Sequence, residues 1–217
     1  EWFDGNWSYS RTLSFDNSTR TENLVDFPVL VKLDSSVIDY AKTHDQGWDL
    51  RFFDQDGTAL SHEVELWDEG GTSYVWVKIP QIDASSSTDS IVMYYGNAGV
   101  ADSGEDSAGV WSDYCAAYHL NENQGATGTL ADAAGSFDAV NAGSTDTAGV
   151  IGNAQDFDGA GQYIDLGDNR SWINNASGAT LSIWMNADTT TGSGDLIGLT
   201  RNDPADTGAS RITLIRN

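Results

Sequence analysis

The sequence predicts an all-β protein of two antiparallel, jelly-roll-like β-sandwich domains, the second of them incomplete in this chain. Two observations carry this prediction. The first half contains short runs in which apolar and polar residues alternate with a period of two, as in half-buried strands. Turn sequences such as Asp56-Gly57 and Gly70-Gly71 separate these runs. Many short strands with regular turns are typical of a sandwich.

Each strand of the first half is predicted from its own pattern. In residues 7–15, aromatic and aliphatic side chains fall on one face and Ser and Thr on the other. The next strand candidates are residues 29–33, 50–53, 62–67, 74–79 and 91–95. A short helix is expected over Ser35–Lys42, with Ser35 or Ser36 as its N-cap. The alternation also places Trp7 and Trp76 in the core.

The second half is predicted to be a separate domain. Residues 96–109 are small, acidic and rich in Gly and Ser, as linkers are. We therefore expect domains at 1–100 and 110–217, joined by a linker at 101–109. The strand candidates of the second domain are residues 116–120, 154–157, 162–166, 180–186 and 212–215. Trp184, in the fourth of these, is expected in the core.

The charge of the chain restricts its partners. The 217 residues include 33 acids and 10 bases, for a net charge of −23. Binding to nucleic acid is not expected, because phosphate contacts need Lys and Arg. Membrane insertion is not expected either, because no run of about 18 apolar residues occurs. The single cysteine excludes an internal disulfide and a multi-cysteine zinc site.

Two interpretations of the acidity stay open. A carboxylate-rich surface stays hydrated in high salt, which indicates a halophilic or marine protein. Alternatively, the Asp residues serve an exported protein that binds calcium, since carboxylate oxygens are its usual ligands. Both predict an extracellular or cell-surface location. The first residue, Glu1, is the kind of start left by signal-peptide removal or by trimming.

Five ordered motifs in the first half carry a family resemblance. They are Trp7-Ser8-Tyr9-Ser10-Arg11, Phe27-Pro28-Val29-Leu30-Val31, Asp49-Leu50-Arg51-Phe52, Val75-Trp76-Val77-Lys78-Ile79-Pro80 and Tyr94-Tyr95-Gly96-Asn97. Over about residues 2–100 the chain resembles a domain family of unknown function in exported bacterial and archaeal surface proteins. It also resembles the extracytoplasmic N-terminal region of some biopolymer-transport proton-channel proteins.

The second half resembles the start of a concanavalin A-like, laminin-G-like jelly roll. The matching segments are Tyr118-His119-Leu120-Asn121-Glu122, Gly149-Val150-Ile151-Gly152-Asn153-Ala154, Phe157-Asp158-Gly159, Tyr163-Ile164 and Leu181-Ser182-Ile183-Trp184. Such a jelly roll is longer than the segment after Val110. We therefore expect that the protein continues past Asn217, or that another chain supplies the missing strands.

Catalysis has little support in the sequence, and no enzyme is expected. Glu63 and Glu65 lie two apart on a predicted strand and so share a face, a spacing that paired-carboxylate glycosidases can use. The pattern favours a solvated strand face opposite inward Val64 and Leu66. Cys115 lies near His119, but a cysteine among apolar residues is usually an inert core residue.

A structural calcium ion is the metal that the sequence favours. Asp156 and Asp158 lie on one face before a turn, and a jelly roll would bring Glu122 and Asp132 near them. The laminin-G-like resemblance implies calcium at a sheet rim. In the alternative interpretation, these are ordinary turn carboxylates.

A glycan site is expected around Trp172. This residue lies in a polar stretch with Asn169, Arg170 and Asn174, which would supply hydrogen bonds beside a ring that stacks on a sugar. The alternative is a tryptophan that closes one end of the sandwich.

The leading functional hypothesis is a non-enzymatic extracellular binding or adhesion module of a cell-surface protein, which recognises a glycan or another surface partner. One alternative is a structural subunit of a surface filament, in which further copies of the chain join through an open sandwich edge. The other is the extracytoplasmic sensor region of a proton-channel protein.

Overall fold

The computed structural model describes residues 4–135, 137–167, 177–187, 194–200 and 211–216. Nearly all of its regular structure is strand, and all strand pairs are antiparallel, which confirms the predicted all-β class. The chain divides into two compact units, residues 1–167 and 168–217. The predicted domain boundary at 101–109 stays a prediction.

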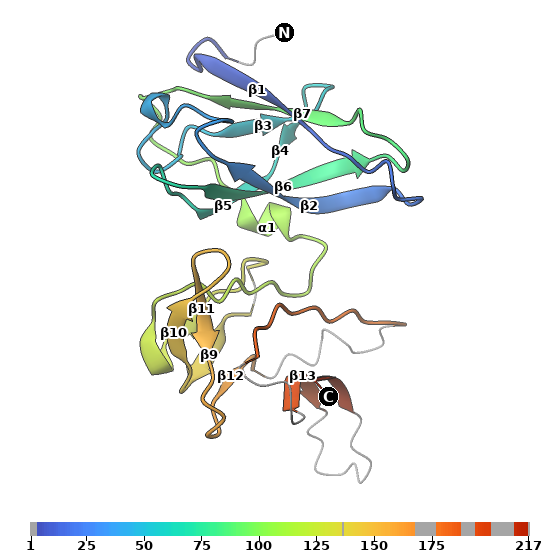
Figure 1. The fold of residues 1–217 in the computed structure, drawn as a ribbon, viewed down its shortest axis with the longest axis vertical. Helices are drawn as coiled ribbons and strands as arrows, with labels where there is room; N and C mark the ends of the chain where they lie inside the picture. Colours follow the sequence, from blue (N-terminus) through green and yellow to red (C-terminus); the bar gives the residue numbers. More distant parts are fainter. Residues whose placement is uncertain (1–3, 136, 168–176, 188–193, 201–210, 217) are drawn as a thin grey trace. The chain divides into compact units, whose positions relative to one another are not determined.

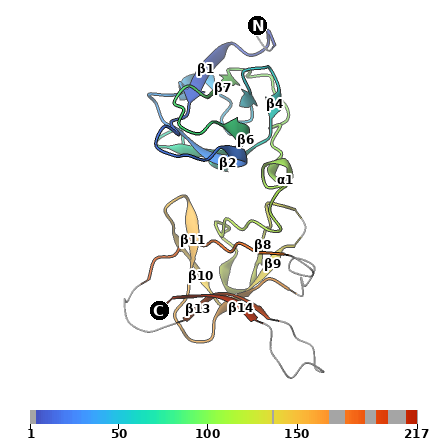
Figure 2. The ribbon, with the colours of Figure 1, turned by 90° about the vertical axis from the view of Figure 1, so that its right-hand side faces the viewer.

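Two sheets form a sandwich in the first part of the chain (Figures 1 and 2). One sheet has the order β1-β7-β3-β4 and the other β2-β6-β5. Their strands are β1 (Tyr9–Ser14), β2 (Leu24–Leu33), β3 (Arg51–Phe53), β4 (Ala59–Leu60), β5 (His62–Leu66), β6 (Ser73–Ile82) and β7 (Ser90–Tyr95). These strands overlap the six predicted ones, and short β4 is an addition.

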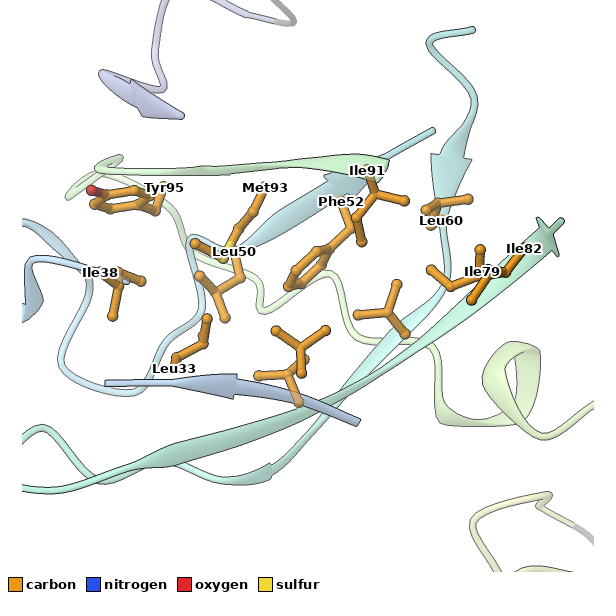
Figure 3. Packing of buried hydrophobic residues seen from close by; sticks show 13 residues of the cluster. Leu33, Ile38, Leu50, Phe52, Leu60, Ile79, Ile82, Ile91, Met93 and Tyr95 are labelled. Atoms are coloured by element: carbon orange, nitrogen blue, oxygen red, sulfur yellow. The ribbon is translucent and has the colours of Figure 1, made fainter. Parts of the chain in front are cut away.

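The core lies between the two sheets (Figure 3). Strand β6 shows why: Val75, Val77 and Ile79 alternate inward and are at most 2% exposed. Opposite them, Phe52 and Met93 project from the other sheet and are at most 1% exposed. Trp76 lies on the outer face of β6, so its predicted place in the core is wrong. Trp7 is buried as predicted.

The predicted helix at 35–42 is also wrong in extent. A single 3₁₀ turn, η1 (Tyr40–Lys42), forms there, and Asp39 caps it by accepting a hydrogen bond from the Ala41 amide. Ser36 instead donates to the Asp34 carboxylate in the preceding turn. Ser and Asp compete in this way with helix formation, since their side chains bond nearby backbone groups.

Asp49 joins two loops at one end of the sandwich. Its carboxylate is fully buried and accepts hydrogen bonds from the amides of His44, Gly96 and Asn97, at 3.0, 2.6 and 3.1 Å. Gly96 has φ +89°, and a Cβ there would lie 2.4 Å from the Tyr9 ring. Only glycine therefore fits this turn, which brings its amide to the buried carboxylate.

Residues 107–165 form smaller elements after the sandwich. They comprise α1 (Ser107–Val110), η2 (Gly125–Thr127), a three-stranded sheet β12-β9-β8 and a hairpin β10-β11. The strands are β8 (Thr129–Leu130), β9 (Ala139–Ala142), β10 (Thr145–Ala148), β11 (Asn153–Asp156) and β12 (Tyr163–Asp165). The predicted strands at 154–157 and 162–166 are confirmed, whereas residues 116–120 are irregular.

Polar side chains fill much of the interior of this region. Asn141 and Ser144 are 2% and 0% exposed. The Asn141 amide donates to the carbonyls of Gly125 and Ser144, and the Ser144 hydroxyl contacts both Asn141 and Gln155. Since the side chains of Asn141, Ser144 and Gln155 all have partners, this network costs little desolvation energy and fixes the geometry of the hairpin.

The second unit contains β13 (Gly194–Thr200) and β14 (Arg211–Arg216), which pair with each other. The predicted strand at 212–215 is therefore confirmed. Residues 180–186 form no strand, and Trp184 is 97% exposed rather than in a core.

Replacement of Asp49 by Asn is expected to destabilise the sandwich by about 2–4 kcal/mol. The substitution removes the charge and one acceptor oxygen from a site where three amides converge. Urea denaturation followed by tryptophan fluorescence measures the change. Asp56→Asn, in an exposed hairpin turn, is the matched control and should cost much less. Equal losses in the two variants would contradict this role.

Candidate functional site

The densest group of chemically active side chains lies on the outer face of β5 and β6. Successive side chains of a strand point to opposite faces, and His62 of β5 points into the core. Glu63 and Glu65, one and three positions later, therefore point outward. Trp76 of β6 pairs with Glu63 in the register and shares that outer face. The two carboxylates therefore lie beside an indole ring, on a face that the sheet itself leaves uncovered.

His119 inserts between the two carboxylates. Its Nε2 lies 3.2 Å from Glu63 Oε2, and its Nδ1 lies 2.6 Å from Glu65 Oε2. Each ring nitrogen thus faces its own carboxylate, an arrangement that an imidazolium, with two N–H donors, satisfies completely. His119 is 56 positions from Glu63 in the chain, so the contact is made by the fold.

Neutral donors complete the coordination of the carboxylates. The Trp111 indole N–H donates to Glu63 at 2.7 Å, and the Trp76 indole N–H donates to Glu65 at 2.9 Å. The Asn121 amide donates to the other oxygen of Glu65 at 2.7 Å. We call these six residues the carboxylate clamp: Glu63, Glu65, Trp76, Trp111, His119 and Asn121.

Aromatic rings shield the clamp from water. Trp76 and Trp111 meet edge to face at 5.1 Å between ring centroids, and Trp111 meets His119 at 5.5 Å. Tyr114 also meets Trp111 edge to face, at 5.1 Å between ring centroids. The side chains of Glu65, Glu63 and His119 are accordingly only 4%, 14% and 17% exposed.

Burial and pairing act in opposite directions on the charges of the clamp. Burial alone would lower the pKa of His119, but its hydrogen bonds to Glu63 and Glu65 and their negative charges raise it to about 9. Burial alone would raise the pKa of Glu63, yet the hydrogen bonds from His119 and Trp111 keep that pKa below its usual value. Both shifts favour the charged forms of His119 and Glu63 at neutral pH.

The geometry of the clamp is better suited to holding two segments of the chain together than to proton transfer with a substrate. A general acid or base needs a proton that it can exchange with a substrate within hydrogen-bond reach. Here the histidine is held on both sides by carboxylates, and both carboxylates also bind indole or amide donors. What the clamp does achieve is to fasten the segment 111–121 to the outer face of the sandwich.

The sequence interpretation of this region was wrong in two respects. Glu63 and Glu65 do share a face, as predicted, but that face is covered rather than solvated. Cys115 is exposed rather than in the core, and it takes no part in the clamp. The available signal was Trp76 on the outer face of the neighbouring strand, because a large aromatic ring there calls for a cover.

The predicted glycan-binding residues lie outside the described part of the chain. These residues are Asn169, Arg170, Trp172 and Asn174. Their role stays a prediction.

All four predicted calcium ligands lie within the described residues. Asp132 is 5% exposed and accepts hydrogen bonds from the amides of Ala117, Ala134 and Phe137. Glu122 Oε1 accepts from the Ala131 amide, and Glu122 Oε2 is buried with no hydrogen-bond partner among the described residues.

Asp156 ends β11, and Asp158 caps the turn after it by accepting from the Ala160 amide. Within the described ranges, no three His, Cys, Asp or Glu residues are grouped closely enough to hold a metal. Carboxylate oxygens are ligands that calcium prefers, and the calcium expectation stays a prediction.

Comparison with known proteins finds one family model that matches part of the chain. Residues 46–147 match the model of a family described as a domain of unknown function (DUF2341). The match confirms the predicted resemblance to a family of unknown function, although it begins and ends later than residues 2–100. All six residues of the carboxylate clamp fall within the matched range. No curated protein and no solved structure matches the chain.

None of the helices among the described residues has the length and apolar character needed to cross a membrane.

The clamp predicts a loss of stability at alkaline pH. Because folding raises the pKa of His119 from 6.5 to about 9, its contribution is complete below pH 6.5 and is lost as pH rises through 9. We expect His119→Gln to lower the free energy of unfolding by on the order of 3 kcal/mol at pH 6, with the difference from wild type vanishing above pH 9. Denaturant titration across this range measures it. His44→Gln is the control, and a pH-independent difference would contradict the prediction.

Buried His62 predicts the opposite behaviour in acid. Burial beside the core lowers its pKa from 6.5 to about 4, and its Nε2 has no hydrogen-bond partner among the described residues. Stability is therefore lost as pH falls from 6.5 through 4, because the unfolded chain binds the proton more tightly. In His62→Leu the loss over this range should be smaller by on the order of 3 kcal/mol. An identical acid profile in both proteins, measured by denaturant titration, would count against it.

Proposed function

We propose that the chain is a non-enzymatic binding or spacing module of an exported cell-surface protein. The observation that carries the proposal is the carboxylate clamp. The acid pair that a glycosidase would offer to a substrate is bound instead to His119, Trp111, Trp76 and Asn121. A buried ion-paired cluster under aromatic rings suits a module that keeps a rigid shape between neighbouring segments.

The net charge supports a location outside the cell. With 33 acids against 10 bases, self-repulsion is strong at low ionic strength and is screened in salt. Many described acids contribute to turns rather than to ion pairs: Asp34, Asp56 and Asp158 each accept a hydrogen bond from an amide two residues later. Such a surface stays soluble where salt strengthens apolar association.

A glycan or another surface molecule is the proposed partner. The aromatic and amide residues of 169–174 are the candidates for glycan contact. A structural subunit that joins further copies of itself is the second candidate, and the open edges of the sandwich favour it. Among the residues that the structure describes, each sheet ends in strands with one neighbour, β1 and β4 in one sheet and β2 and β5 in the other.

The proposal is tested by activity and binding assays on the same protein. Incubation with a panel of polysaccharides, followed by a reducing-end assay, should release no sugar. Turnover that disappears in Glu63→Gln or Glu65→Gln would overturn the non-enzymatic assignment. On a glycan array, any binding should be lost in Trp172→Ala and retained in Trp48→Ala, a tryptophan outside the proposed site.

Calcium is proposed as a structural cofactor of the region around Asp158. If it binds only the folded state, calcium at 100 times its Kd should stabilise the protein by about 2.7 kcal/mol. Thermal melting in excess calcium and in a chelator measures the effect. The increase should be lost in Asp158→Asn and kept in Asp56→Asn. Identical melting with calcium and with chelator would exclude calcium as a structural cofactor.

A further inference from the structure

Two Asn-x-Ser/Thr sequences lie in the sandwich part of the chain, and their surroundings differ. They are Asn6-Trp7-Ser8 and Asn17-Ser18-Thr19. In exported proteins such a sequence is the acceptor for N-linked glycans, which are attached to the asparagine amide in a surface loop. The same pattern at Asn169 and Asn175 begins outside the described residues. Because so short a motif also arises by chance, accessibility must decide between the two sites.

Asn17 has a structural role that excludes modification. Its Nδ2 donates hydrogen bonds to the carbonyls of Glu22 and Asp83, at 3.1 and 3.0 Å. A glycan on Nδ2 would replace one of these two N–H groups and leave a carbonyl without its donor. It would also need space around a residue that is only 5% exposed. The folded protein therefore cannot carry a glycan at Asn17.

Asn6 lies in an exposed turn before β1. The Asn6 backbone N–H donates to the Asp4 carboxylate at 2.8 Å, and the Trp7 backbone N–H donates to the Asp4 carbonyl at 3.1 Å. The main chain of Asn6 is thus held, while the residue is exposed and its side-chain amide makes no hydrogen bond among the described residues. A Cβ placed on the adjacent Gly5 would meet no atom within 4 Å, so the space around the turn is open.

The rest of this motif is also accessible. Ser8, which supplies the hydroxyl group, is exposed. Trp7, between Asn6 and Ser8, is buried, and its indole N–H donates to the Asp49 carbonyl at 2.6 Å. The two residues that a glycosyl transferase must recognise therefore lie on the surface, on either side of a residue anchored in the sandwich. The folded protein presents this acceptor without local unfolding.

We propose that Asn6 is a site of N-linked glycosylation. The substrate class is an oligosaccharide joined through its C1 atom to a lipid phosphate, which a transferase of the exporting cell would supply. Nδ2 of Asn6 forms the new bond to C1 and loses one proton, while the bond from C1 to the phosphate oxygen breaks. The lipid phosphate leaves with the electron pair of that bond. The inference rests on the proposed function as a module of an exported protein.

Secretion of the full chain by a host that attaches N-linked glycans tests the proposal. A reporter Asn-x-Thr sequence appended after Asn217 shows that the pathway acts on this chain. Mass spectrometry of glycopeptides from the secreted, folded protein should find a glycan at Asn6 and none at Asn17. The glycan at Asn6 should be lost in Ser8→Ala, which keeps the asparagine, and retained in Ser8→Thr, which keeps the hydroxyl group.

A matched control separates modification from folding. Thr19→Val removes the second motif without touching the buried Asn17 amide, and it should leave the glycan at Asn6 unchanged. Thermal melting compares each variant with the parent protein. Ser8→Ala should melt like the parent, because Ser8 is exposed and lies outside the strands.

Three results would overturn the proposal. The first is an unmodified Asn6 in protein whose reporter sequence carries a glycan. The second is a glycan that persists at Asn6 in Ser8→Ala. The third is a glycan at Asn17 in the folded protein, because accessibility would then not decide between the two motifs. None of these results affects the glycan-array and turnover assays, so a failure here is distinguishable from a failure of the proposed binding module.

Discussion

The architecture after the sandwich depends on one electrostatic requirement: two carboxylates on the outer face of β5 must be compensated before that face can be covered. Burying an unpaired carboxylate costs several kcal/mol, whereas a carboxylate with a cation and N–H donors is tolerated. His119 supplies the cation for both Glu63 and Glu65, and two indoles and one amide supply the remaining donors. The route of residues 111–121 follows from that pairing.

The two parts of the first unit are stabilised by different means. The sandwich has an apolar core in which Leu33, Leu50 and Val75 are fully buried. Residues 120–156 instead rely on a hydrogen-bonded interior around Asn141 and Ser144, and they leave Val140 53% exposed. A polar interior contributes less hydrophobic free energy but specifies one arrangement strongly, since any shift leaves buried groups unpaired.

The fold class and most strands of the sandwich could be predicted from the sequence, because period-two alternation is a local signal and β6 and β7 carry it clearly. The face on which Glu63 and Glu65 lie was also predictable. Which residue covers that face was not predictable, because His119 lies 56 positions from Glu63 and no local pattern encodes such a contact. Trp76 shows the same limit, because alternation defines two faces and does not say which is the core. In the second half, short strands such as β9 and β10 contain Ala, Asn and Asp, which are depleted in strands, so their composition does not mark them as strands.

The long separation between the partners of the clamp also imposes an order of events during synthesis. Strands β5 and β6 lie close together in the chain and can pair as a hairpin, whereas the histidine follows later, after the whole sandwich has left the ribosome. Until then, both glutamates face water, where a charged row discourages neighbouring nascent chains from adding to the incomplete sheet. The same two carboxylates thus serve first as a guard against aggregation and afterwards as an anchor.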